Sequence, residues 1–211
     1  MQAILAKNGE ELARSFRRHV QDETQQDGFV ADNGHLALIT LLGAGPDSKT
    51  TEYAVRALAS LSMNPAFDLA LIEAGVAAPA VALLRIASNG TTVHCNVAAL
   101  VNNLVTKLKG KEAFQKAGAI VPLVSLLGAA PKVASAAAAA IWNLSYDAEA
   151  EQRVYHAEVV AAGAIPPLVA LLHGETASTA VGALCILSAE AAGTAAIQSA
   201  GGIVPLVALL H

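Results

Sequence analysis

Aromatic residues and cysteines are scarce in this sequence, and their scarcity narrows the fold class. Phe, Trp and Tyr make up 4% of the 211 residues, whereas hydrophobic residues make up 55%. The apolar content is therefore mostly Ala, Leu, Val and Ile, which suits close packing of helices better than an aromatic-rich β-sandwich. The two cysteines, Cys95 and Cys185, lie far apart within apolar segments. We expect them to be small buried side chains in a reducing compartment, without a disulfide.

The sequence also lacks a signal peptide and an excess of positive charge. Lys7 interrupts the first apolar residues, and Glu10 and Glu11 follow, so the N-terminal residues lack the apolar run of about 7–15 residues of a signal peptide. The net charge of -4 provides no overall attraction for nucleic acid or anionic lipid. The longest uncharged stretch, residues 191–210, carries glycines and Pro205 and is a poor membrane span. We expect a cytoplasmic and/or nuclear protein with no nucleic-acid partner and no membrane span.

What the sequence has is an internal repeat. Residues 73–84, 116–127, 161–172 and 199–210 align without gaps, each with a glycine, a proline four residues later and a Leu-Leu pair, and residues 31–42 form a weaker fifth copy. The anchor residues are spaced by 42, 43, 45 and 38 residues; they are Asn33, Gly75, Gly118, Gly163 and Gly201. A period of this length is typical of a helical solenoid.

Each repeated position has a physical reason. The anchor ends a short helix with a positive φ, which is cheap for Gly and tolerable for Asn. The prolines fall in the first turn of the next helix, where the missing N–H is not needed; they are Pro79, Pro122, Pro167 and Pro205. A breaker-rich loop follows each Leu-Leu pair, and a longer apolar helix follows the loop. Each unit is therefore predicted to be a short helix, a Pro-started helix and a long third helix.

Three helices in about 42 residues, with Gly-x-x-x-Pro and Leu-Leu in phase, resemble the armadillo repeat family. The sequence of residues 137–145 is similar to that of plant-type or protist-type members of the family, whereas the similarity to importin-alpha-like members is not close. The resemblance implies an all-α fold, a right-handed α–α superhelix of three-helix repeats. A HEAT repeat would have two helices in each unit.

This pattern predicts the organisation of the chain. Residues 1–28 are a helical cap or a degenerate repeat, with a polar helix over residues 10–25. Repeats follow at 29–67, 68–110, 111–151 and 152–191, and residues 192–211 are a truncated fifth repeat. Because solenoids need polar caps, we expect an uncovered apolar face at the last repeat. Either the chain is a section of a longer stack, or a partner covers this face, or a second copy covers it by self-association.

The resemblance also implies a groove, lined by the third helices, that binds an extended peptide. In the family an asparagine before the last Leu of that helix bonds the peptide backbone, and the matching positions here are Ser60, Asn103, Asn143 and Ile186. A side-chain amide offers both a donor and an acceptor. Alternatively, Asn103 and Asn143 bond neighbouring helix carbonyls.

Importin-alpha-like members place a tryptophan four residues before that asparagine, but here those positions hold Arg56, Ala99, Ala139 and Gly182. Trp142 adjoins Asn143 and should point about 100° away, into the core between repeats. We therefore expect a smooth groove floor with six polar points: Arg56, Ser60, Asn96, Asn103, Ser135 and Asn143.

No catalytic, cofactor-binding or metal-ligating set is predicted, because the histidines show no metal-ligand spacing and no nucleophile–base set can be argued. The sequence favours a non-enzymatic protein–protein interaction scaffold whose groove holds an extended peptide or partner protein. The alternatives are the substrate-recruiting block of a larger ubiquitin-ligase-type protein and a degenerate nuclear-import adaptor.

Overall fold

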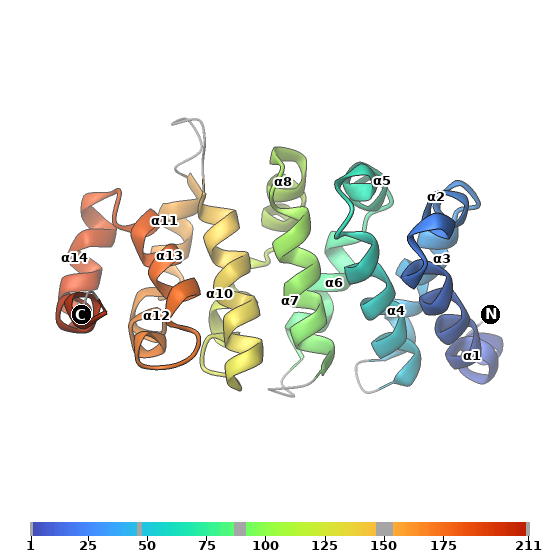
Figure 1. Ribbon diagram of the computed structural model, residues 1–211, viewed down its shortest axis with the longest axis horizontal. Helices are drawn as coiled ribbons and strands as arrows, with labels where there is room; N and C mark the ends of the chain where they lie inside the picture. Colours follow the sequence, from blue (N-terminus) through green and yellow to red (C-terminus); the bar gives the residue numbers. More distant parts are fainter. Residues whose placement is uncertain (1, 46–47, 87–91, 147–153, 210–211) are drawn as a thin grey trace. The chain divides into compact units, whose positions relative to one another are not determined.

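The computed structural model describes residues 2–45, 48–86, 92–146 and 154–209, and these residues form helices and no strand. The chain divides into two compact units, residues 1–117 (unit 1) and residues 118–211 (unit 2). Helices α1 to α8 belong to unit 1 and helices α9 to α15 to unit 2 (Figure 1).

Unit 1 repeats the order short helix, second helix, long third helix. Its helices are α1 (Gln2–Gln21), α2 (Glu23–Ala31), α3 (Gly34–Leu41), α4 (Lys49–Leu61), α5 (Asp68–Glu73), α6 (Ala77–Leu84), α7 (Thr92–Leu104) and α8 (Leu108–Lys116). The 3-10 turns η1 (Leu42–Ala44) and η2 (Pro65–Phe67) extend α3 and precede α5. The long helices pack in a row, α1 on α4 and α4 on α7 (Figure 1).

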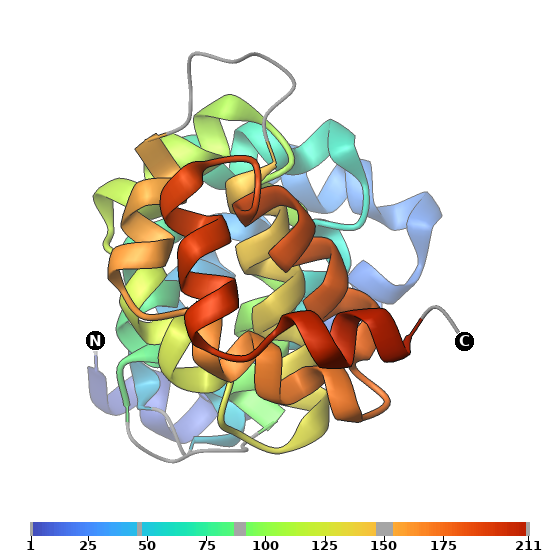
Figure 2. The same ribbon diagram turned by 90° about the vertical axis from the view of Figure 1, so that its left-hand side faces the viewer.

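Unit 2 continues the same order. Its helices are α9 (Ile120–Leu126), α10 (Pro131–Ser145), α11 (Val154–Ala161), α12 (Ile165–Ala170), α13 (Ala177–Leu187), α14 (Ala191–Ser199) and α15 (Ile203–Ala208), with the 3-10 turn η4 (Leu171–His173) after α12. The third helix α10 packs on the third helix α13, and the short helix α11 packs on α14. Figure 2 looks onto this unit with α14 and α15 in front.

The anchors have the predicted backbone conformation. All five have a positive φ, from 60° at Asn33 to 80° at Gly163. At Gly75 the turn is a Schellman motif, because its N–H donates to the Ile72 carbonyl at 3.0 Å and the Val76 N–H donates to the Leu71 carbonyl at 3.3 Å. The same two bonds recur at Gly163 and Gly201. The anchor therefore turns the chain sharply from the short helix into the second one.

Small and branched apolar side chains fill the space between the third helices. In α10 four alanines are fully buried, Ala134, Ala137, Ala138 and Ala140. Their small size lets the backbone of α10 come close to that of α13, while larger side chains such as Leu58 and Leu100 are fully buried in unit 1. The scarcity of aromatic residues follows from this close packing.

The short helices begin earlier than the predicted borders. The borders at 28/29, 110/111 and 191/192 fall inside α2, α8 and α14. Asp22 marks the physical start of the first full unit, because its side chain accepts from the Thr24 N–H at 3.1 Å and caps α2. This cap also breaks the predicted helix over residues 10–25 into α1 and α2.

Replacement of Gly75 tests the anchor. A Cβ at Gly75 meets no atom within 4 Å, so its only cost is the φ of +78°. We expect Gly75→Ala to lower the free energy of unfolding by about 1–2 kcal/mol. Gly75→Asn should cost less, since Asn33 adopts the same conformation. Urea unfolding checks both, with Gly128→Ala as a control that has open space and no positive φ. Equal losses for Ala and Asn would contradict this explanation.

A buried carboxyl begins α5. Asp68 is 5% exposed, and its Oδ1 finds no hydrogen-bond partner among the described residues. Burial raises the pKa of this carboxyl above its ordinary value, and the positive charge of Lys107 offsets part of the rise. The folded chain therefore keeps this proton to a higher pH than the unfolded chain does, so stability is lost as the pH rises through the folded-state pKa.

Asp68→Asn should therefore stabilise the protein in a pH-dependent way. Both side chains are neutral at about pH 3, but at about pH 7 only Asp68 bears the cost of a buried charge. We expect the melting temperature of the variant, minus that of the parent, to be larger at neutral pH than in acid. Asp27→Asn, at an exposed carboxyl of α2, is the matched control. A difference that does not change with pH would contradict the assignment.

Candidate functional site

The third helices of unit 1 carry most of the predicted groove residues, and α1 is one of these helices. Arg18 lies 15 residues before the anchor Asn33, just as Ser60 lies 15 before Gly75 and Asn103 lies 15 before Gly118. Because α1 packs on α4 as α4 packs on α7, Arg18 takes the position at which α7 has its asparagine. Helix α1 thus extends the face formed by α4 and α7 as a third helix.

Asn103 is held by the neighbouring repeat. Its Nδ2 donates to Ser62 Oγ at 3.0 Å, and the Ser62 hydroxyl donates to the Ala59 carbonyl at 2.9 Å. Asn102 Nδ2 lies 3.4 Å from Asn103 Oδ1. The local bonding considered as an alternative is therefore present, although to a hydroxyl and not to a carbonyl. Half-buried Asn103 keeps a second amide hydrogen and one lone pair of Oδ1 in a fixed orientation.

The other predicted residues lie in both units. Asn96 donates to the Thr92 carbonyl within α7 at 2.9 Å, and Arg56 lies 3.7 Å from a Glu52 carboxylate oxygen on α4. In unit 2 the hydroxyls of Ser135 and Thr179 lie 3.3 Å apart and link α10 to α13.

Ser60 and Asn143 are half-buried, on α4 and α10 respectively. The structure therefore brings Arg56, Ser60, Asn96 and Asn103 together on unit 1, and Ser135 and Asn143 on unit 2. Their role in binding a ligand stays a prediction.

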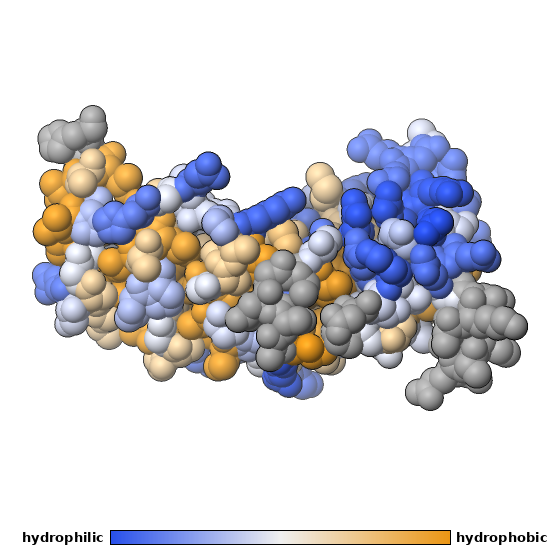
Figure 3. All heavy atoms as spheres, turned by 90° about the horizontal axis from the view of Figure 1, so that it is seen from below, coloured by the Kyte–Doolittle hydropathy of each residue, from blue (hydrophilic) through white to orange (hydrophobic). Residues whose placement is uncertain are grey.

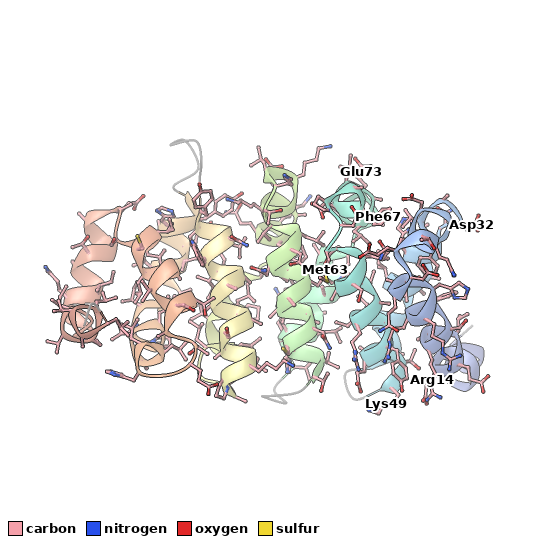
Figure 4. The ribbon with its side chains drawn as sticks, viewed as in Figure 1. Arg14, Asp32, Lys49, Met63, Phe67 and Glu73 are labelled. Carbon is pink, nitrogen blue, oxygen red and sulfur yellow. The ribbon has the colours of Figure 1, made fainter. Side chains whose placement is uncertain are left out.

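Arginines gather around Tyr53, at the contact of α1 with α4. The guanidinium carbons of Arg14 and Arg17 lie 5.4 Å and 5.5 Å from the centre of the Tyr53 ring, within cation–π range. Arg14 also lies 3.4 Å from the Tyr53 hydroxyl and 2.9 Å from a Glu10 carboxylate oxygen. Its hydrogen bond with Tyr53, and more weakly Glu10, raises the pKa of Arg14, which stays charged. Figure 4 shows Arg14 on α1 near Lys49, where α4 begins.

A cleft of about 460 Å³ opens between the C-terminal ends of α1 and α4. Ser60 and Met63 line one side, and Val20 and Gln21 line the other. Met63 is 77% exposed and lies at the end of α4 opposite Lys49 (Figure 4). The predicted Ser60 thus borders a hollow whose walls are both polar and apolar.

Trp142 departs from its predicted place. Its side chain leans toward the next third helix, as expected, but it is 37% exposed and not part of the core. A Cβ added at Gly182 would lie 2.7 Å from carbon atoms of the indole, so the ring covers the backbone of Gly182 on α13. The predicted smooth floor at Gly182 is therefore occupied by an aromatic side chain.

The prediction also missed Arg14, Arg17 and Tyr53. The spacing between Arg18 and the anchor Asn33 could have revealed them. It equals the spacing of 15 residues between Ser60 and Gly75, and so places Arg18 and its neighbours on a third helix. The weak first copy, which lacks the proline, concealed this relation. Arg17, the residue before Arg18, leans onto Tyr53 of the next helix, and Trp142, the residue before Asn143, leans onto Gly182 in the same way.

Other chemistry-bearing groups were placed only in part correctly. Cys185 is exposed and Cys95 half-buried, so neither is the buried side chain that was expected, and neither forms a disulfide. Within the described residues no group of three or more His, Cys, Asp or Glu side chains could hold a metal ion. No single described helix has the length and hydropathy of a membrane span, and two helix pairs pass that test only together across bends of 88° and 81°.

The last two helices expose apolar side chains. None of the residues of α15 is buried; Val204 is 77% exposed, and Ile203 and Val207 are about half exposed. An apolar cavity of about 310 Å³ lies beside them, lined in part by Val181 and Leu184 of α13. Hydrophobic side chains gather over this end of unit 2 in Figure 3. Self-association through this face stays a prediction.

Comparison with known proteins identifies the fold. No protein-family model matches the chain, and no curated protein does. The designed armadillo repeat protein YIII(Dq)4CqI is 28% identical, with a TM-score of 0.81 over 95% of this chain and 84% of that chain. An engineered protein is 26% identical, with a TM-score of 0.84 over 97% of this chain and 85% of that one. A second designed armadillo repeat protein, YIII(Dq.V1)4CPAF, was solved in complex with the peptide (KR)4 and is 27% identical, with a TM-score of 0.79 over 93% of this chain and 83% of that one.

These likenesses confirm the predicted fold class: the chain is an all-α solenoid of the armadillo type. The similarity to plant-type or protist-type repeats stays a prediction.

Trp142, the only tryptophan, reports on its own contact with Gly182. We expect Gly182→Ala to displace the indole, to shift its fluorescence to the red and to lower the free energy of unfolding by about 1–3 kcal/mol, because the new methyl group overpacks the contact. Gly28→Ala is the matched helical control, since Gly28 has open space and alanine there should stabilise α2 by about 0.5–1 kcal/mol. An unshifted emission spectrum in Gly182→Ala would contradict the packing described.

Proposed function

We propose that this chain is a non-enzymatic binding scaffold that holds an extended peptide, or a partner protein, against its third helices. The proposal rests on one observation above all: the half-buried amide of Asn103 is held in place by Ser62 and still has a donor and an acceptor to offer. An extended main chain presents both an N–H and a C=O to such a group. The armadillo protein solved with the peptide (KR)4 supports the same use of the fold.

We assign this scaffold no catalytic step and no cofactor, and we propose a cytoplasmic and/or nuclear location. The substrate-recruiting block of a larger ubiquitin-ligase-type protein and a degenerate nuclear-import adaptor would both use the same helices. Reading the flanking coding sequence for a U-box or further repeats separates the first alternative. The import role needs slots for lysine side chains, but the positions of the slot-forming tryptophans hold Arg56, Ala99, Ala139 and Gly182.

The test is peptide binding by the full chain. Peptides of about ten residues, selected from a displayed random library, would be measured by fluorescence anisotropy against the parent and Asn103→Ala, Asn143→Ala and the double variant. If each amide bonds a peptide main chain, the double change should weaken binding about 5- to 150-fold, because each bond contributes about 0.5–1.5 kcal/mol. Ser62→Ala should weaken binding less, since it frees Asn103 without removing it.

Gln198→Ala serves as the control, because Gln198 is an exposed amide on the short helix α14 and not on a third helix. Melting temperatures of all variants exclude unfolding as the cause of a loss. The proposal fails if every selected peptide binds the double variant as tightly as it binds the parent.

A further inference from the structure

Three arginines on the α1–α4 face lack a close carboxylate partner. Arg14 pairs with Glu10 at 2.9 Å, whereas Arg17 and Arg18 form no ion pair with any described residue. Arg56 has only the longer contact of 3.7 Å with Glu52, and that carboxylate also lies 2.6 Å from Lys49. The positive charge of this face is therefore only partly neutralised inside the chain.

The packing of α1 on α4 orders these arginines. Tyr53 lies under the guanidinium groups of both Arg14 and Arg17, and Arg56 follows Tyr53 by three residues, so that it lies on the same side of α4. Stacking on an aromatic ring limits the freedom of a guanidinium while leaving its N–H groups directed outward. A ligand carboxylate would meet donors that have already lost part of their conformational freedom.

An adjacent hollow gives the face a second kind of contact. Arg17 and Arg56 each lie about one helical turn from the cleft, since Val20 and Ser60 line it. The same cleft exposes Met63 and Pro65, which suit an apolar side chain. Hydrophilic side chains gather over these N-terminal helices in Figure 3.

We infer that the α1–α4 face is an acid-recognition subsite: it binds a peptide segment whose Asp or Glu carboxylates contact Arg17 and Arg56 and whose apolar neighbour enters the cleft at Met63. This inference rests on the proposed function and names its ligand class. Arg18 lies in the last turn of α1, where a positive charge stabilises the C-terminus of the helix. Arg17 and Arg56 do not lie in a last turn, so the subsite is assigned to these two residues.

Charge decides between an acidic peptide and other occupants. A basic peptide such as (KR)4, the ligand of a designed neighbour, would be repelled by the arginines of this face. Nucleic acid needs an extended row of cations, but this face interleaves Glu10, Glu52 and, in the cleft, Glu23, on a chain of net charge -4. A short segment with one or two carboxylates fits the arrangement better.

The experiment uses the full chain and the peptides selected for the proposed function. We expect the selected sequences to be enriched in Asp and Glu. Arg17→Gln and Arg56→Gln should each weaken the binding of an acidic peptide about 10-fold, because each removes a charge-assisted contact. Replacing the acidic residues of the peptide by Asn or Gln should remove the sensitivity to both variants. Lys116→Gln, at an exposed cation of the short helix α8, should leave binding unchanged.

Several outcomes would overturn the inference. It falls if the selected peptides lack acidic residues, or if Lys116→Gln weakens binding as much as Arg17→Gln does, which would indicate unspecific attraction. Binding of a single-stranded oligonucleotide in competition with the peptide, and with the same dependence on Arg17, would assign the face to nucleic acid instead. The proposed function survives the first two results if Asn103→Ala still weakens binding, whereas both fail if neither the asparagines nor the arginines matter. Melting temperatures again show that the variants fold.

Discussion

The contact between consecutive third helices is the interaction on which the rest of each unit depends. In unit 1 the buried branched side chains of α4 and α7 let these two helices pack on each other, and in unit 2 the buried alanines of α10 let it pack on α13. The short and second helices cannot bury their apolar sides alone, so they are stable only where a third helix covers them. The proposed binding face lies on these third helices, and its geometry within each unit therefore follows from core packing.

Much of this arrangement could be predicted from residues alone. The anchors, the prolines and the three-helix order depend on local backbone preferences, and a glycine or proline repeated in phase indicates these preferences directly. The positive φ of Asn33 could be predicted although the residue is not glycine, because its phase in the repeat required it.

The residues that line the proposed binding face were harder to predict from the sequence, for physical reasons. The third-helix role of α1 depends on its packing against α4, and the first copy lacks the proline that would have revealed the phase. The position of the Trp142 indole depends on the missing side chain of Gly182, which lies on the next repeat. The pattern of residues within one repeat contains no information about the space that side chains of the neighbouring helix leave unfilled. Polar partners such as Ser62 and Asn103 are also long-range pairs, so spacing along the chain does not predict them.

At two places the residue that precedes a groove position contacts the following third helix: Arg17 contacts Tyr53, and Trp142 contacts Gly182. This overlap limits how the scaffold can diversify. At these two places a substitution that suits a new ligand also changes the support of the neighbouring repeat. The smallest exchangeable module at α1–α4 and at α10–α13 is therefore the pair of adjacent third helices together with the side chains that cross between them.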